Sequence, residues 1–309
     1  MITTVTMNPC IDKTVWVDGF LYGGTNRVAA TRADLAGKGL NISLALKALG
    51  VSSTVVSFDF SENAGALGAM LEEKGIAAVL TTAKGAMRTN LKVFERGEKV
   101  MTELNERGAE ISETEIAEIK AAVLRVAKES SVLVLSGSLP PNVPETFYRG
   151  IMREAARDDL RIFVDASGGT LREALTAKPF LIKPNTDELE QLVGRKLPTK
   201  PERIQAAREA VELGAEICCL SLGAEGAMIV SKDEGYFAEA LKVDVKSAQG
   251  AGDSMVAGMI AAISEGKGIA DMLRSAVAAA SAAIMREGTQ FGSVEDYARL
   301  YEDVCLETL

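Results

Sequence analysis

Short apolar segments alternate with helical segments along most of the chain, and a polar loop follows nearly every apolar segment. Val132 to Leu135 runs into Ser136-Gly-Ser-Leu-Pro-Pro141, and Phe180 to Ile182 runs into Lys183-Pro-Asn-Thr-Asp-Glu188. Continuously apolar strands of this length are typical of a parallel sheet that is covered on both faces. The alternation therefore predicts an α/β fold with a mostly parallel central sheet and helices on both faces.

Two stretches break this alternation, because their extended segments are not followed by helices. One contains a Gly23-Gly24 turn and the other contains Arg96-Gly97-Glu98. We predict that these stretches, about 12–35 and 87–105, form one small β-sheet lid inserted into a single domain of residues 1–309. Helices are predicted at about 42–49, 65–74, 112–128, 202–213, 255–263, 270–288 and 293–306.

The loop from Ser247 to Ser254 leads directly into an apolar helical face that begins at Met255. Backbone N–H groups of Gly250, Ala251, Gly252 and Asp253 would form the free amino end of that helix, which is a cradle for phosphate. An aspartate there would repel a phosphate unless it had a chemical role, and the role we predict is general base for an attacking hydroxyl. The alternative is a plain glycine-rich turn in which Asp253 caps the helix.

Composition excludes several classes of site. The chain contains no histidine, which removes Ser-His-Asp triads and histidine metal sites. Its four cysteines lack C-x-x-C spacing, so neither zinc nor a redox pair is predicted. A formal net charge of −9 makes a nucleic-acid partner unexpected. With no signal-peptide pattern and no apolar run long enough to span a bilayer, a cytoplasmic protein without membrane contact is expected.

Other polar residues lie, like Asp253, just after predicted strands. Asp12 follows the first strand, and Lys38 stands between Gly37 and Gly39 at a helix start with Asn41 close behind. Taken singly, each of these features is also what an ordinary turn would show. In open α/β sheets, ligands bind at the carboxyl ends of the strands, so the shared position favours one common site.

Six motifs carry a family resemblance over nearly the whole chain. The chain resembles the ribokinase-like, phosphofructokinase-B sugar kinases, and the sequence around residues 4–12, 102–105 and 252–258 is most similar to the 1-phosphofructokinase branch. Tagatose-6-phosphate kinases are the near neighbours. The motifs are Asn8-Pro-x-x-Asp12, Gly37-Lys-Gly-x-Asn41, Ser136-Gly-Ser-Leu-Pro140, Lys183-Pro-Asn-x-x-Glu188, Ser221-Leu-Gly-x-x-Gly226 and Gly250-Ala-Gly-Asp253.

The resemblance implies ATP-dependent phosphorylation of a ketose phosphate, with fructose 1-phosphate converted to fructose 1,6-bisphosphate as the first expectation. Tagatose 6-phosphate and fructose 6-phosphate are the alternative substrates, and a non-catalytic sugar-phosphate sensor is a remote one. A dinucleotide-dependent dehydrogenase is disfavoured because no G-x-G-x-x-G follows the first strand.

The resemblance also implies roles for particular residues. Asp253 would be the general base, with the amides of Gly250, Ala251 and Gly252 stabilising the transferring phosphoryl group. The sugar phosphate would be held by Asp12, Gly37, Lys38, Gly39, Asn41, Arg88 and Ser138. The nucleotide would be held by Lys183, Asn185, Glu188, Ser221, Gly223 and Gly226, with Asn185 and Glu188 positioning Mg²⁺ through water.

Three departures from the family pattern bear on the site. Ala36 replaces a usual first glycine, and Phe58 to Gly65 replaces a glycine-rich turn near the sugar pocket. Ala248-Gln249 precede the anion loop where a threonine or valine is common, and this flank helps form a monovalent-cation site in some relatives. Dependence on potassium therefore stays open. In relatives the lid also forms dimer contacts, so a homodimer through the lid is a further implication.

Overall fold

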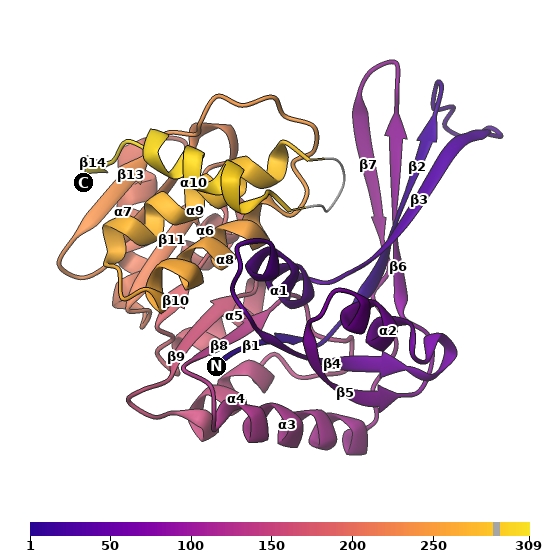
Figure 1. The fold of residues 1–309 in the computed structure, drawn as a ribbon, viewed down its shortest axis with the longest axis horizontal. Helices are drawn as coiled ribbons and strands as arrows, with labels where there is room; N and C mark the ends of the chain where they lie inside the picture. Colours follow the sequence, from indigo (N-terminus) through magenta and orange to yellow (C-terminus); the bar gives the residue numbers. More distant parts are fainter. Residues whose placement is uncertain (287–290) are drawn as a thin grey trace.

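The computed structural model describes residues 1–286 and 291–309, and these residues build a ten-stranded central sheet (Figure 1). The strand order is β14-β13-β12-β11-β10-β9-β8-β1-β4-β5. Neighbours from β11 to β5 run parallel, and those from β11 to β14 run antiparallel. The predicted mostly parallel sheet is confirmed. Its strands are β1 (Ile2–Thr6), β4 (Thr54–Phe60), β5 (Ala77–Ala83), β8 (Val132–Ser136), β9 (Arg161–Asp165), β10 (Leu181–Ile182), β11 (Ile217–Ser221), β12 (Ala227–Val230), β13 (Gly235–Ala238) and β14 (Glu307–Thr308).

Helices cover both faces of this sheet, as the apolar strands predict. Along β8, Leu133 and Leu135 belong to one core cluster and Val134 belongs to the other, so the strand is buried on both sides. Helices α3 to α7 pack into the first cluster, and α1, α8, α9 and α10 pack into the second. The helices are α1 (Lys38–Ala48), α2 (Ala66–Glu73), α3 (Glu113–Ala127), α4 (Phe147–Ala155), α5 (Gly168–Leu175), α6 (Thr186–Val193), α7 (Lys200–Glu212), α8 (Ala251–Ser264), α9 (Ile269–Ile284) and α10 (Val294–Asp303).

Local signals fix where several helices begin. Ser112 accepts a hydrogen bond from the Glu115 amide while the Glu115 carboxylate accepts one from the Ser112 amide, which is the capping box that the Ser-x-x-Glu spacing at the start of the predicted 112–128 helix indicates. Thr199 with Glu202 caps α7 in the same way. Within the described part of the chain, no helix combines the length and apolarity that a membrane span needs.

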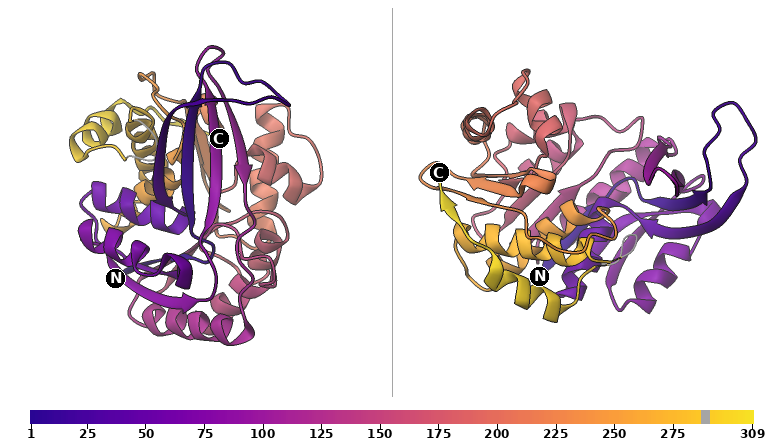
Figure 2. Two further views of the ribbon diagram at one scale, coloured as in Figure 1. Left: turned by 90° about the vertical axis from the view of Figure 1, so that its right-hand side faces the viewer. Right: turned by 90° about the horizontal axis from the view of Figure 1, so that it is seen from above.

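A second, four-stranded sheet projects from the central body (Figures 1 and 2). Its order is β3-β2-β6-β7, with β2 and β6 parallel and the outer pairs antiparallel. Two segments far apart in sequence therefore share one sheet, as predicted, whereas the division of the chain into one domain with an inserted lid stays a prediction. The strands are β2 (Cys10–Val17), β3 (Val28–Ala36), β6 (Arg88–Glu95) and β7 (Val100–Asn105).

Some elements differ from the prediction. Asp12 lies inside β2 and not in a loop after β1, because β2 begins at Cys10 and pairs with β6 from that residue onward. Strand β5 was not predicted; it is an edge strand with few fully buried side chains, so its apolar pattern is weak. Helices α4, α5 and α6 were also missed. The helix expected over 270–288 ends at Ile284, and positions 287 and 288 lie outside the described residues.

Helices α8 and α9 pack at close range, which holds the start of α8 against the sheet. Of the 14 residues of α8, those from Asp253 to Ile263 are all buried. A Cβ atom added at Gly258 would lie 2.4 Å from the carbonyl oxygen of Ser275 in α9. Gly258 is therefore needed for the contact between the two helices and not for a turn.

We expect Gly258→Ala to lower the free energy of unfolding by about 1–3 kcal/mol, because the added methyl group overpacks this crossing. Urea-induced unfolding would measure the change. The matched control is Gly150→Ala in α4, where no heavy atom lies within 4 Å of the added Cβ. The free energy of unfolding of the Gly150→Ala control should rise by up to about 1 kcal/mol, because alanine has a higher helix propensity than glycine. A loss of stability of similar size in both variants would contradict the packing explanation.

Candidate functional site

The start of α8 forms the predicted anion loop. Gly250 has φ 74° and is the residue before the helix, a left-handed conformation that suits glycine. The amides of Ala251, Gly252 and Asp253 lie in the first turn, where no preceding turn supplies acceptors. Lys183 places its ammonium group 3.4 Å from the position that a Cβ on Gly252 would take. Free amides and a cation therefore converge at one point.

Asp253 is buried beside this loop. Its Oδ2 accepts a hydrogen bond of 2.8 Å from Nδ2 of Asn41 in α1. Burial, and then the charge of Asp165, raise the pKa of Asp253 to about 7, against the opposing effects of Asn41, Lys38 and Lys183. A carboxyl group that titrates near neutral pH suits proton transfer at that pH.

Asp165 contacts both Lys38 and Lys183, which the sequence analysis assigned to the sugar phosphate and to the nucleotide. Its Oδ1 lies 3.1 Å from Nζ of Lys38 and 3.5 Å from Nζ of Lys183. Burial alone would raise the pKa of Asp165, but the two ammonium groups hold it below its usual range. Its Oδ2 is buried without a protein partner among the described residues. Sequence reasoning missed Asp165 as a site residue, although it follows a buried strand like the others.

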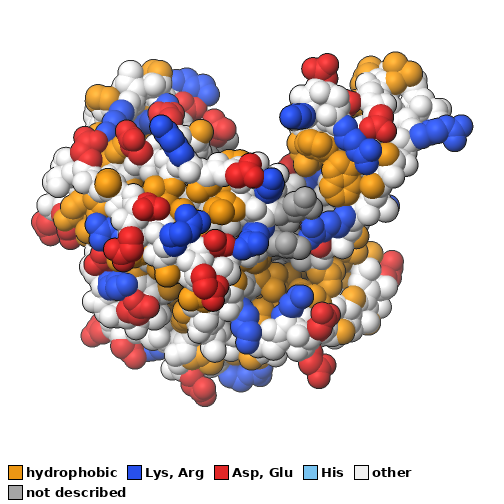
Figure 3. All heavy atoms as spheres, turned by 45° about the horizontal axis from the view of Figure 1, so that its top comes forward, with side chains coloured by type: hydrophobic (Ala, Val, Ile, Leu, Met, Phe, Trp, Pro, Cys, Tyr) orange, Lys and Arg blue, Asp and Glu red, His pale blue; other side chains and the backbone are white. Residues whose placement is uncertain are grey.

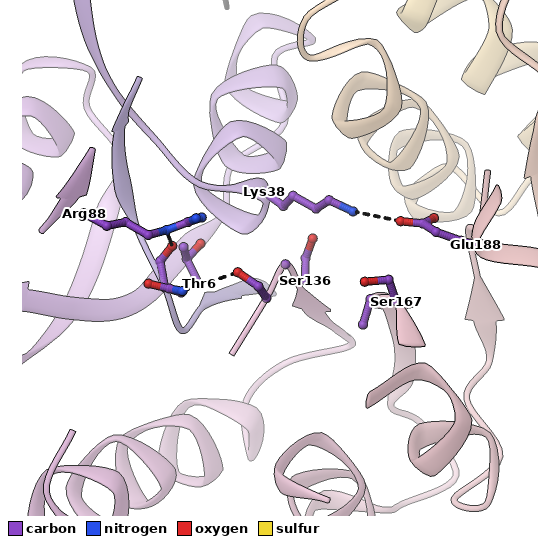
Figure 4. Close-up of a pocket in the computed structure, with 10 residues that line it drawn as sticks. Thr6, Lys38, Arg88, Ser136, Ser167 and Glu188 are labelled. Atoms are coloured by element: carbon purple, nitrogen blue, oxygen red, sulfur yellow. Dashed lines mark hydrogen bonds and ion pairs between the residues drawn. The ribbon is translucent and has the colours of Figure 1, made fainter. Parts of the chain in front are cut away.

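A cavity of about 220 Å³ opens where β1, β8 and the start of α1 meet (Figure 4). Lys38, Arg88 and Ser138, the three residues expected to hold a sugar phosphate, all line it, and Figure 4 shows Lys38 reaching toward Glu188 across it. The complete lining is Thr6, Asn8, Lys38, Arg88, Ser136, Gly137, Ser138, Ala166, Ser167 and Glu188. Two cations at one small polar cavity suit a dianionic group.

A larger pocket of about 790 Å³ is lined in part by the anion loop. Ser221, Gly223 and Gly226, expected beside a nucleotide, line it together with Ala251 and Gly252 of the loop. Apolar side chains, including Met255 and Val277, supply much of the remaining wall. Its size and apolar lining suit an aromatic ring system whose charged end reaches the loop.

Asn185 and Glu188 form the capping box of α6. Asn185 Oδ1 accepts from the Glu188 amide at 2.8 Å, and Glu188 Oε2 accepts from the Asn185 amide at 3.0 Å. Glu188 Oε1 points toward Lys38, 3.8 Å from its Nζ. Among the described residues, no three acidic or cysteine side chains converge as metal ligands. Glu188 Oε1, the carboxylate oxygen outside the capping box, therefore suits a hydrated cation better than direct coordination by several protein groups would.

Asp12 lies on the projecting sheet, where its carboxylate is buried among other side chains of that sheet. Its Oδ2 lies 2.6 Å from Nζ of Lys92, and its Oδ1 accepts from Asn90. Neither Lys92 nor Asn90 was singled out from the sequence. The signal that could have found them is their spacing from Arg88, since alternate residues of a strand share a face. Figure 3 shows the surface hollowed between the projecting sheet and the central body.

Two of the departures from the family pattern have structural explanations. Ala36 ends β3 and is buried, and Gly37 with φ 148° then makes the turn into α1. Phe58 and Phe60 are core residues of β4, and no residue of 58–65 is among those lining the smaller cavity. Ala248 lines the larger pocket beside the anion loop.

Comparison with known proteins gives consistent matches over the whole chain. The model of the family described as pfkB family carbohydrate kinase matches residues 5–296. The chain is similar to 1-phosphofructokinase of Bacillus subtilis, with 32% identity over 304 residues and 98% of each chain covered. It is also similar to the Escherichia coli 1-phosphofructokinase, with 35% identity, 92% of this chain and 90% of the relative covered. The solved structure of phosphofructokinase-2 from Escherichia coli with fructose-6-phosphate has a TM-score of 0.89 at 30% identity, covering 98% of each chain.

We expect Asp253→Asn to raise the thermal unfolding midpoint, because ionised Asp253 is disfavoured in the folded protein. The unfolded chain ionises this group near pH 4 and the folded protein only near pH 7. The free energy of unfolding that is lost because Asp253 is buried therefore grows between pH 4 and pH 7 and is constant above pH 7. The midpoint difference between variant and wild type should therefore widen from pH 4 to pH 7. An exposed control, Asp233→Asn, should show no such trend; a pH-independent difference for Asp253→Asn would refute the assignment.

Proposed function

Because the chain belongs to the pfkB family of carbohydrate kinases, we propose that it transfers a phosphoryl group from ATP to fructose 1-phosphate and forms fructose 1,6-bisphosphate. The observation that carries the proposal is the placement of Asp253, whose carboxylate contacts α1 at the start of α8. Gly252 beside it lines the larger pocket, and Lys38 on α1 lines the smaller cavity. Asp253 thus links the helix that lines the smaller cavity to the helix that lines the larger pocket, and a base held near both acceptor and donor is what phosphoryl transfer needs.

In the proposed reaction, Asp253 accepts the proton of the sugar hydroxyl as its oxygen attacks the γ-phosphorus. The bond from phosphorus to the bridging oxygen breaks, and ADP leaves with that electron pair. Amides of Gly250, Ala251 and Gly252 donate to the oxygens of the transferring group as charge develops on them. Lys183, close to Gly252, adds a positive charge at the same place.

The acceptor is held by opposite charges in the smaller cavity. Lys38, Arg88 and Ser138 bind its existing phosphate group, and the Gly37 to Gly39 turn lets the backbone approach it. Asn41 and Asp12 bind sugar hydroxyls. Arg88 is held at the junction of the two sheets, since its Nε donates to the Asn8 carbonyl oxygen and its Nη1 to that of Glu106. A guanidinium fixed in this way presents its remaining donors in a defined direction.

The carboxylates of Glu188 and Asp165, which both contact Lys38, would hold Mg²⁺. Glu188 keeps one carboxylate oxygen free of the capping box, and Asp165 keeps a buried oxygen without a partner among the described residues. When bound with ATP, the ion neutralises phosphate charge. Asn185 keeps Glu188 in place, and a requirement for a monovalent cation at the flank formed by Ala248 stays a proposal.

Fructose 6-phosphate is the second candidate acceptor, because one of the similar solved structures contains it. Phosphofructokinase-2 from Escherichia coli, whose structure with fructose-6-phosphate resembles this chain, is the reference for that alternative. The lining of the smaller cavity accepts any phosphorylated ketose that presents a dianion to Lys38 and Arg88. Tagatose 6-phosphate is the third candidate.

The projecting sheet also supports a proposal of self-association. Phe20, Leu21, Tyr22, Val100 and Leu104 are large apolar residues of this sheet and its connecting loops that are 49% to 95% exposed. A second copy that placed the same sheet against them would remove this apolar area from water. The proposed partner is therefore an identical chain, joined through the lid.

Release of ADP with Mg·ATP would be measured in parallel for fructose 1-phosphate, fructose 6-phosphate and tagatose 6-phosphate. We expect kcat/KM for fructose 1-phosphate to exceed the others by at least about tenfold, or about 1.4 kcal/mol of transition-state discrimination. If another ketose phosphate is preferred, the mechanism stands and the substrate assignment fails. If no ketose phosphate is turned over, the kinase function itself is refuted.

Asp253→Asn should lower kcat by at least about a hundredfold, since a positioned general base contributes roughly that much or more. For the wild type, kcat/KM should rise with pH and level off above about 7, because only the ionised carboxylate accepts a proton. The Asp253→Asn variant should lose this dependence. Retention of full activity by the variant would show that Asp253 is not the base and would favour a different proton acceptor.

A further inference from the structure

The buried ion pair between Lys92 and Asp12 carries a further inference. Nζ of Lys92 in β6 lies 2.6 Å from Oδ2 of Asp12 in β2, and the two side chains are only 8% and 11% exposed. A buried carboxylate and a buried ammonium group are both costly to desolvate, so such a pair is maintained only where each group compensates the other. This pair lies on the two central strands of the projecting sheet, whose outer strands β3 and β7 are largely exposed.

The strand register brings several polar groups onto one face with Asp12. Strands β2 and β6 are parallel, with Asp12 opposite Asn90 and Thr14 opposite Lys92. Oδ1 of Asp12 accepts hydrogen bonds from Nδ2 of Asn90 at 3.0 Å and from Sγ of Cys10 at 3.4 Å. Both oxygens of the carboxylate are therefore held from the side of the sheet, and the plane of the carboxylate is fixed.

Neighbouring charges do not replace Lys92. Asp34 lies opposite Asp12 in β3 but is paired with Arg32 at 2.7 Å. Glu103 lies opposite Lys92 in β7, yet it is exposed and the short contact of Lys92 goes to Asp12. Arg88 is on the same face, and its Nη1 donates to Oδ1 of Asn90. Lys92 is thus the cation in direct contact with Asp12, and Arg88 reaches the same network through Asn90.

We infer that Lys92 is a positioning residue for the acceptor sugar: it balances the charge of Asp12 and fixes the direction of its remaining lone pairs toward the sugar hydroxyls. The inference rests on the proposed function, in which Asp12 binds those hydroxyls. Because hydroxyl donors must meet the carboxylate at hydrogen-bond distance and angle, a rotated Asp12 binds the sugar poorly. ATP binds in the other pocket and does not depend on this orientation.

The test compares Lys92→Met, which keeps the length and apolar stem, with Lys92→Arg, which keeps the charge. We expect Lys92→Met to raise KM for fructose 1-phosphate at least about tenfold while KM for ATP changes by less than about twofold. Lys92→Arg should recover most of the loss. Lys13→Met is the matched control, because Lys13 is the exposed lysine on the opposite face of β2. An unchanged KM for the sugar phosphate in Lys92→Met would overturn the inference.

A double-mutant cycle with Asp12→Asn separates positioning from direct contact with the sugar. If Lys92 acts through Asp12, adding Lys92→Met to Asp12→Asn should change KM for the sugar phosphate by less than about threefold. An additional tenfold loss, roughly the size of a full independent contact, would show that Lys92 acts on its own and would overturn the positioning role. The double variant contains no unpaired charge from this pair, so it keeps the test independent of whether Lys92→Met folds stably.

Wild-type turnover separates this inference from the proposed function. The ketose phosphate that the wild type uses best serves as the substrate for every variant. Turnover by the wild type with no selective effect of Lys92→Met refutes the role of Lys92 alone. Absence of turnover of any ketose phosphate by the wild type refutes both.

Discussion

The shared carboxylate of Asp165 is the interaction on which the rest of the site depends. A single oxygen contacts the ammonium groups of Lys38 and Lys183, one at the smaller cavity and one at the anion loop. Two cations this close would repel each other in a poorly hydrated setting, and an anion between them offsets that repulsion. The register of the central sheet supplies this anion, because Asp165 ends β9 beside Ser136 of β8. The distance between the two halves of the site is thereby set by rigid strands.

The same charges make the protein suited to bind polyanions despite its overall acidity. The net charge of −9 would repel a nucleotide and a sugar phosphate at long range. Close to the site, Lys38, Lys183, Arg88 and the amino end of α8 offset the carboxylates of Asp165, Glu188 and Asp253. Because a local field in a cleft is screened less than the surface charge, these few groups decide whether an anion is bound. Recognition is therefore a matter of placement and not of net charge.

Much of this organisation was predictable from the sequence, and the reasons are physical. Apolar strands followed by polar loops identify the carboxyl edge of the sheet, and most of the chemically notable residues are at that edge. Two local features could likewise be predicted because they depend on neighbours in sequence: the capping box of Ser112 and Glu115, and the turn at Gly250. Asp12 was placed wrongly in a loop because its strand is defined by pairing with β6, which lies far along the chain. Lys92 was missed because its partner Asp12 is remote in sequence, whereas Asp165 ends a buried strand and the signal that identified the other residues applies to it as well.

Two buried carboxylates make the site costly to fold. Asp253 is buried with an anion nearby, and Asp12 is buried with its cation. Both arrangements oppose stability unless the surroundings compensate, which the amide of Asn41 does in one case and Lys92 does in the other. The two compensations differ in kind. The amide of Asn41 is neutral and only partly opposes burial and the charge of Asp165, which raise the pKa of Asp253 to about 7, whereas Lys92 brings a full positive charge into direct contact with Asp12. Under the proposed function, this difference suits Asp253 to exchange a proton and Asp12 to accept hydrogen bonds from the sugar.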